Sequence, residues 1–197
     1  MPRSSLGRGL LLAALAAGLA LVWLLGGDRL LADDLMYLKT GPIGHAWQFM
    51  AYWLGHGGVQ AGAMGFLLLL GLAVRKLDLT PTALAAGGLL VQIVKHLVGR
   101  PRPGRNMLAW DLQGLSFDSD LHSFPSGHAT TTFALAAVLA ARFPRWSWAF
   151  YLAALFISLG RVVGGSHFVS DVLVGAMLGL VVGWLLAWRC KVGVGGR

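Results

Sequence analysis

Six long apolar segments dominate this chain, and they restrict what it can fold into. They cover about residues 9–27, 58–74, 80–98, 128–142, 146–163 and 169–188. A helix needs roughly 20 apolar residues to cross a bilayer, and a helix satisfies its own backbone hydrogen bonds, as the hydrocarbon requires. We therefore predict an all-α fold, a polytopic membrane bundle of six transmembrane helices, in which residues 1–197 form a single membrane-embedded domain.

The first segment resembles a signal peptide because Arg3 and Arg8 precede it and it contains Ala14-Leu15-Ala16. The apolar run continues to Leu25, however, and so exceeds the ~7–15 residues of a cleaved signal core. We expect this segment to be a retained helix.

Composition limits the partners and cofactors of the chain. The net charge of +8 is spread over the ends of the apolar segments, which favours membrane topology and anionic lipid over nucleic acid as its cause. All eight acidic residues are aspartates, and the absence of glutamate disfavours a carboxylate-rich metal centre. Only one cysteine, Cys190, is present, so an internal disulfide is excluded.

The distribution of charge predicts an orientation. With six spans, the side that carries both termini holds nine basic residues and a single acid, Asp78, whereas the other seven aspartates lie on the opposite side. The positive-inside rule then makes both termini cytoplasmic, in what we expect to be a bacterial inner membrane. Trp146, Trp148, Trp184 and Trp188 fit an aromatic belt on that side. Within the outer stretch 28–57, the spacing of Trp47, Tyr52 and Trp53 predicts an interfacial helix.

Three polar blocks lie where the segments meet the outer side. The block "KHLVGRPRPGR" ends the third segment and contains Lys95, Arg102 and Pro103. The block "PSGH", which is Pro125, Ser126, Gly127 and His128, begins the fourth segment. The block "GRVVGGSHFVSD" joins the fifth segment to the sixth and contains Arg161, His167 and Asp171. Together they resemble the three-part signature of the type 2 phosphatidic acid phosphatase superfamily. One position departs from that pattern: Gly160 stands where the family has serine.

The resemblance, which covers residues 95–171, implies a lipid phosphate phosphatase, and the chemistry of the blocks agrees with it. A phosphate monoester carries roughly −1.5 to −2 charges at neutral pH. Cationic side chains and the amides of a helix N-terminus bind such an anion, and glycine allows its close approach. We therefore expect the phosphate to be bound by Lys95, Arg102, Ser126, Gly127 and Arg161.

His167 and Asp171 are four residues apart, which places them on one face of a helix. We predict that Asp171 accepts a proton from the imidazole and orients it, that His167 attacks phosphorus, and that His128 protonates the leaving oxygen. The family resemblance implies that this phosphohistidine mechanism needs no metal and no cofactor. The site is expected on the periplasmic or extracellular face.

Several points stay open at this stage. The substrate is phosphatidylglycerol phosphate, phosphatidic acid, undecaprenyl pyrophosphate or lipid A, and the 104–123 loop and the 28–57 segment are expected to select it. The alternatives are a lipid phosphotransferase and a non-enzymatic lipid or phosphate transporter.

The roles of several polar residues also stay open. Arg100 and Arg105 contact either a second phosphate or only lipid, and His96 is given no role. We expect a solvated loop rather than a metal site at Asp111, Asp118, Asp120 and His122. Close helix packing is predicted at Gly175, Gly179 and Gly183.

Overall fold

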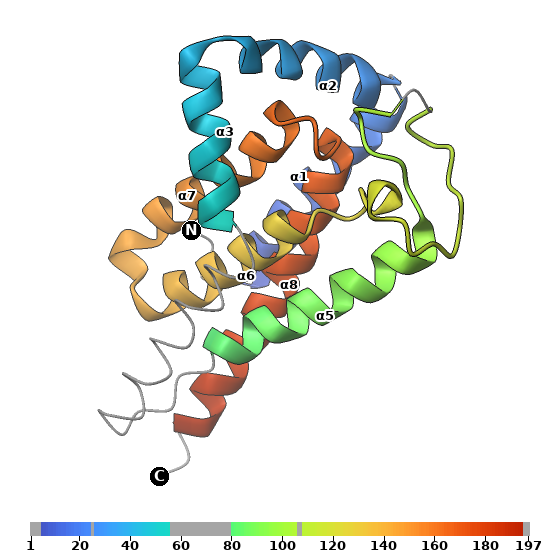
Figure 1. Ribbon diagram of the computed structural model, residues 1–197. Coiled ribbons are helices and arrows are strands. Elements are labelled where there is room, and N and C mark those ends of the chain that lie inside the picture. The colour runs from blue at the N-terminus through green and yellow to red at the C-terminus, as the bar shows by residue number, and fades with distance from the viewer. Residues whose placement is uncertain (1–4, 25, 56–79, 106–107, 195–197) are drawn as a thin grey trace.

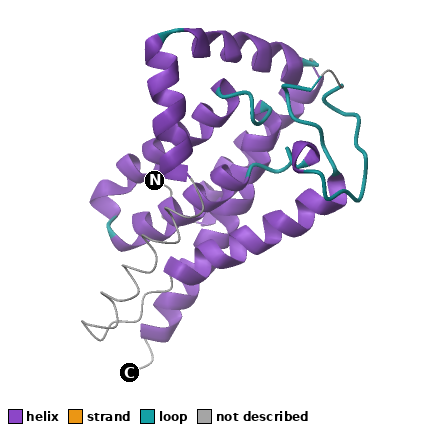
Figure 2. Cartoon of the chain, viewed as in Figure 1, coloured by secondary structure: helices purple, strands orange, loops and turns teal. Residues whose placement is uncertain are grey.

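The computed structural model describes residues 5–24, 26–55, 80–105 and 108–194, and this part of the chain is helical without a β-strand (Figure 2). The α-helices are α1 (Ser5–Leu24), α2 (Gly27–Tyr37), α3 (Pro42–Gly55), α5 (Thr80–Val98), α6 (Gly127–Arg142), α7 (Ser147–Val163) and α8 (Val169–Val194). Short 3-10 helices are η1 (Leu38–Thr40), η2 (Ser119–Leu121) and η3 (Pro144–Trp146). The all-α prediction is confirmed for the described residues.

The centre of the fold is the contact between α6 and α8, with α5 and α7 packed on α6 (Figure 1). Glycines on α8 allow this contact: a Cβ at Gly175 would lie 2.6 Å from the carbonyl oxygen of Ser126, and one at Gly183 would lie 2.6 Å from that of Ala134. A Cβ at Gly179 would overlap the carbonyl oxygen of Thr130. The predicted helix packing at these glycines is therefore confirmed.

Two helices of the described residues are long and apolar enough to cross a membrane, η3 with α7 (Pro144–Val163) and most of α8 (Val169–Trp188). A third span is added if α1 and α2, which meet at a bend of 94°, count as one. The predicted spans 80–98 and 128–142 coincide with α5 and α6, but α6 has only 16 residues, and the described segment Gly88–Val98 of α5 is an apolar helix too short to cross a bilayer by itself. The predicted span 58–74 lies outside the described residues.

One boundary in the N-terminal part differs from the prediction. The helix expected over 9–27 ends at Leu24, because Gly26 adopts a left-handed conformation (φ 58°) from which α2 starts in a new direction. The outer stretch after it contains two helices: α2 runs across the top of the view in Figure 1, and α3, which carries Trp47, Tyr52 and Trp53, descends from it along α7.

The packing of α8 on α6 generates a stability prediction. Replacement of Gly179 by alanine places a methyl group against the backbone of α6, and overpacking of this kind costs about 1–3 kcal/mol. We expect Gly179→Ala to lower the thermal unfolding midpoint in detergent. The matched control is Gly18→Ala in α1, where an added Cβ meets no atom within 4 Å and alanine is the better helix former. Equal or higher stability of Gly179→Ala would contradict the packing.

Candidate active site

The first turn of α6 is tied directly to the first turn of α8. Ser126 is fully buried and caps α6: its Oγ accepts a hydrogen bond from the backbone N–H of Ala129 at 3.4 Å. Its own N–H donates to the carbonyl oxygen of Asp171 at 3.0 Å. The cap uses a lone pair of the Ser126 hydroxyl, so its hydrogen remains for a ligand oxygen. This pairing brings the Pro-Ser-Gly-His corner beside His167 and Asp171.

His167 is held by a backbone carbonyl rather than by its predicted carboxylate partner. Its Nδ1 lies 2.7 Å from the carbonyl oxygen of Ser123 and 3.8 Å from Oδ2 of Asp171. A carbonyl only accepts, so Nδ1 carries the proton and Nε2 keeps its lone pair. Asp171 Oδ2 also accepts hydrogen bonds from the hydroxyl of Ser123 (2.5 Å) and the N–H of Phe168 (2.8 Å). Asp171 thus contacts Ser123 and lies close to the imidazole, and its orienting role stays a prediction.

The surroundings of His167 keep its imidazole neutral. The side chain is almost completely buried in the turn between α7 and α8. Burial lowers the pKa of His167 to about 4, and the positive charges of Lys95 and Arg161 act in the same direction against the opposing effect of Asp171. At neutral pH the ring is therefore uncharged and its Nε2 is available as a nucleophile.

Lys95, Arg102 and Arg161, one at the end of α5, one in the following loop and one near the end of α7, interact electrostatically with one another. Lys95 donates to the carbonyl oxygen of His122 at 2.9 Å, and its Cε would lie 3.9 Å from a Cβ built on Gly127. Arg102 Nε donates to the carbonyl oxygen of Ser119 at 3.2 Å. Arg161 is 7% exposed, and within the described residues its buried Nε has no hydrogen-bond partner. Three mutually repelling cations thus converge from separate elements.

A second group of arginines is neutralised by aspartates. Arg29 pairs with Asp33, Arg100 pairs with Asp28 and Asp171, and Arg105 pairs with Asp118 and Asp120. In the described ranges, no carboxylate forms such a pair with Lys95, Arg102 or Arg161. Aspartates act on Lys95 and Arg102 only through space, so this group of cations is suited to attract an anion.

His128 and the predicted phosphate ligand Arg161 lie close to the same aromatic ring. Tyr52 of α3 has its ring centroid 6.3 Å from that of His128 and 5.4 Å from Cζ of Arg161. The sequence pattern placed Tyr52 on an interfacial helix and gave no signal of this contact. Ser123 was also missed, although it lies only three residues before Ser126.

The substitution at Gly160 has a steric explanation. A Cβ at this position would overlap the methyl group of Ala51 and lie 3.2 Å from Nε1 of Trp47. Trp47 is fixed there, since its Nε1 donates to the carbonyl oxygen of Phe156 at 3.1 Å and its ring stacks on that of Phe156. The close approach of α3 to α7 therefore leaves no space for the serine of the family pattern.

Arg105 and His96, whose roles the sequence left open, form contacts within the protein. Arg105 binds Asp120 at 2.6 Å, and this bond raises the pKa of Arg105 and lowers the pKa of Asp120. His96 Nδ1 contacts the carbonyl oxygen of Gln92 at 2.7 Å, and its ring packs on that of His122. Among the residues that the structure describes, no three side chains of His, Cys, Asp or Glu are grouped as a metal site.

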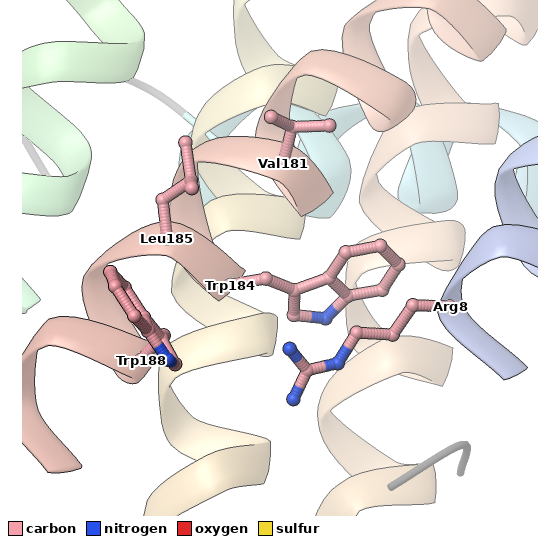
Figure 3. A pocket seen from close by; sticks show the side chains of 5 residues that line it. All are labelled: Arg8, Val181, Trp184, Leu185 and Trp188. Carbon is pink, nitrogen blue, oxygen red and sulfur yellow. The ribbon is translucent and has the colours of Figure 1, made fainter. Parts of the chain in front are cut away.

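A separate cavity lies at the other end of α8 (Figure 3). Arg8 of α1 reaches toward Trp184 there, with Cζ 5.6 Å from the ring centroid, and Val181, Leu185 and Trp188 complete the lining. Trp184 is about 20 Å from Asp171 along the helix, at about 1.5 Å per residue. This cavity contains none of the motif residues.

The fold is that of known PAP2 type membrane phosphatases. The first transmembrane PAP2 type phosphatidylglycerolphosphate phosphatase from Bacillus subtilis is similar with a TM-score of 0.65, at 21% identity over 94% of this chain and 95% of that one. LpxE from Aquifex aeolicus has a TM-score of 0.61, at 26% identity over 78% of this chain and 92% of that one.

Sequence comparison defines the family. The model of the PAP2 superfamily matches residues 79–192, more than half of the chain, and the chain belongs to this superfamily and is an integral membrane protein. The lipid A 1-phosphatase of Rhizobium etli is 36% identical over 105 residues, which are 52% of this chain and 44% of that protein. That of Porphyromonas gingivalis is 35% identical over 109 residues, 53% of this chain and 22% of that protein. The chain spans less than half the length of these relatives.

The buried position of His167 generates a prediction for its titration. Nitrogen NMR of the histidine rings should show His167 as a neutral Nδ1–H tautomer from neutral pH down to about pH 4, well below the ordinary histidine pKa of about 6.5. The His167→Gln variant assigns the signal. Protonation of His167 near pH 6.5 would show that the ring is hydrated and not held as described.

Proposed function

We propose that this protein is a membrane lipid phosphatase that hydrolyses a phosphate group through a phosphohistidine at His167. The observation that carries the proposal is the set of three cations that form no salt bridge with a carboxylate of the described residues, beside a buried neutral imidazole. A phosphate dianion supplies a counter-charge to these cations, and the planar fork of arginine suits paired phosphate oxygens. The Nε of Arg161, which has no hydrogen-bond partner in the part of the chain that the structure describes, is available for such a bond.

In the proposed mechanism, Lys95, Arg102 and Arg161 hold the non-bridging oxygens, with the amide of Gly127 and the hydroxyl of Ser126 as further donors. Nε2 of His167 attacks phosphorus, the bond from phosphorus to the lipid oxygen breaks, and His128 donates its proton to that oxygen. Water then attacks the phosphohistidine while His128 takes up its proton. Phosphoryl transfer is mainly positioning and charge stabilisation, so the protein needs no further chemical group in this scheme.

Among lipid substrates, we propose the phosphate of lipid A first, because the relatives at 35–38% identity are lipid A 1-phosphatases. We also propose the topology that the charge distribution favours: six spans in one domain, cytoplasmic termini, and an active site on the periplasmic face. The pairing of Asp28, Arg100 and Asp171 is consistent with this orientation, since it joins two of the aspartates assigned to the outer side.

The function is tested by phosphate release from purified protein in detergent. Lipid A, phosphatidylglycerol phosphate, phosphatidic acid and undecaprenyl pyrophosphate are compared, with and without an added alcohol acceptor. We expect release from lipid A and a loss on the order of 10⁴-fold in His167→Asn. His45→Asn, an exposed histidine of α3, is the control and should retain activity.

The outcomes of this test are distinct. Turnover only when an acceptor is added would identify a phosphotransferase. Lipid binding without turnover would favour a transporter. Full activity of His167→Asn would refute the assigned nucleophile.

The two histidines have separable roles in this scheme. An activated aryl phosphate has a leaving group that needs no proton, so His128→Asn should still be phosphorylated by it. The variant lacks the base for hydrolysis, and labelled phosphoenzyme should therefore accumulate in samples quenched with detergent at alkaline pH, where the P–N bond of phosphohistidine is stable, while His167→Asn gives none. A phosphoenzyme in His167→Asn, or none in His128→Asn, would reverse or remove these assignments.

A further inference from the structure

Arg100 is the largest fully buried side chain among the described residues, and its bonds identify its role. Its exposed fraction is 0%, and Nε donates to the carbonyl oxygen of Ala109 at 2.7 Å. One terminal nitrogen donates to Ser170 Oγ at 2.7 Å and to Asp171 Oδ1 at 2.5 Å. The other donates to Asp28 Oδ2 at 2.7 Å. Four of the five guanidinium N–H groups thus bind protein acceptors, and because the side chain has no exposed surface, neither lipid nor a second phosphate has access to it.

Asp28 of α2 is the second carboxylate on this guanidinium. It is 1% exposed, and its Oδ1 accepts the backbone N–H of Ser170 at 3.0 Å. Its Oδ2 accepts a short hydrogen bond from the Ser170 hydroxyl in addition to that from Arg100. Asp28 thus holds both the first turn of α8 and the arginine that binds Asp171.

The aromatic rings around Arg100 reinforce this geometry. Its Cζ lies 4.1 Å from the centroid of Trp110 and 4.6 Å from that of Phe168. Stacked and doubly paired, the planar guanidinium cannot rotate without breaking several bonds at once. It therefore presents a fixed donor to Asp171 Oδ1.

We propose that Asp28 is a positioning residue of the active site, acting through Arg100 and Ser170 on Asp171 and from there through Ser123 on His167. The last two links are the hydroxyl of Ser123 on Asp171 Oδ2 and the carbonyl of Ser123 on His167 Nδ1. The expected fall in kcat rests on the proposed function, whereas the expected change in the tautomer of His167 does not. Residue 28 lies outside the 79–192 region that matches the family, so the N-terminal part of the chain supplies a component of the catalytic geometry.

The test is the isosteric variant Asp28→Asn, with Asp33→Asn as matched control. Asp33 lies on the same helix but is exposed, and its salt bridge within the described residues is with Arg29. Loss of a residue that orients an active-site side chain from behind, without touching the substrate, reduces activity about 10- to 100-fold. We expect such a fall in kcat for Asp28→Asn with KM nearly unchanged, because Lys95, Arg102 and Arg161 are not touched. Asp33→Asn should behave as wild type.

A coupling measurement separates positioning from general destabilisation. The kcat of the double variant Asp28→Asn/Asp171→Asn is compared with that of Asp171→Asn alone. The two values should be nearly equal, because both residues act through the same series of hydrogen bonds. If Asp28→Asn fails to fold, Ser170→Ala removes the hydroxyl between Asp28 and Arg100 without a change of charge and should lower kcat in the same way. Wild-type kcat in the folded variant, or full additivity with Asp171→Asn, would overturn the proposal.

The NMR signal of His167 gives a readout that does not depend on turnover. Wild type should show the single Nδ1–H tautomer, and Asp28→Asn a mixture of tautomers because the carbonyl of Ser123 is no longer fixed. An unchanged single tautomer would refute the positioning role even in an active protein. A changed tautomer in Asp28→Asn, together with a wild-type protein that releases no phosphate, would support the positioning role and refute the proposed function.

Discussion

The hydrogen bond between the N–H of Ser126 and the carbonyl of Asp171 is the contact on which the rest of the site depends. It joins two helix starts that are more than 40 residues apart in sequence, and it forms only because α6 and α8 approach to backbone distance. Gly175 stands directly against the carbonyl oxygen of Ser126 and permits that approach. The Pro-Ser-Gly-His corner and His167 are therefore adjacent because α6 and α8 pack closely against each other.

The cationic residues near this contact divide into two classes by their partners. Arg29, Arg100 and Arg105 each bind aspartates and hold elements together. Lys95, Arg102 and Arg161 bind only carbonyl oxygens or aromatic rings in the part of the chain that the structure describes. A backbone carbonyl orients a cation without neutralising it, so the second class keeps its charge for an incoming anion.

Much of this arrangement is readable from the sequence, because it depends on local patterns. Apolar periodicity predicts the helices, and the four-residue spacing of His167 and Asp171 places them on neighbouring turns. The 3.8 Å separation of His167 Nδ1 from Asp171 Oδ2, too long for a hydrogen bond, could not be predicted, since it depends on competition: Asp171 has two oxygens, and the donors of Arg100, Ser123 and Phe168 occupy them. The contacts of Asp28 could not be predicted either, because its partners Arg100 and Ser170 lie 72 and 142 residues away in sequence and no spacing rule connects them.

The N-terminal helices therefore contribute at two places that the matched region 79–192 does not contain. From α2, Asp28 holds the carboxylate that supports His167. From α3, Tyr52 lies beside His128 and Arg161, and Ala51 and Trp47 occupy the space over Gly160. The first contribution reaches the imidazole of His167 through a series of hydrogen bonds, and the second lies beside His128 and Arg161. Because α3 borders these two residues from outside the matched region, we expect differences in substrate choice between members of this fold to reside there.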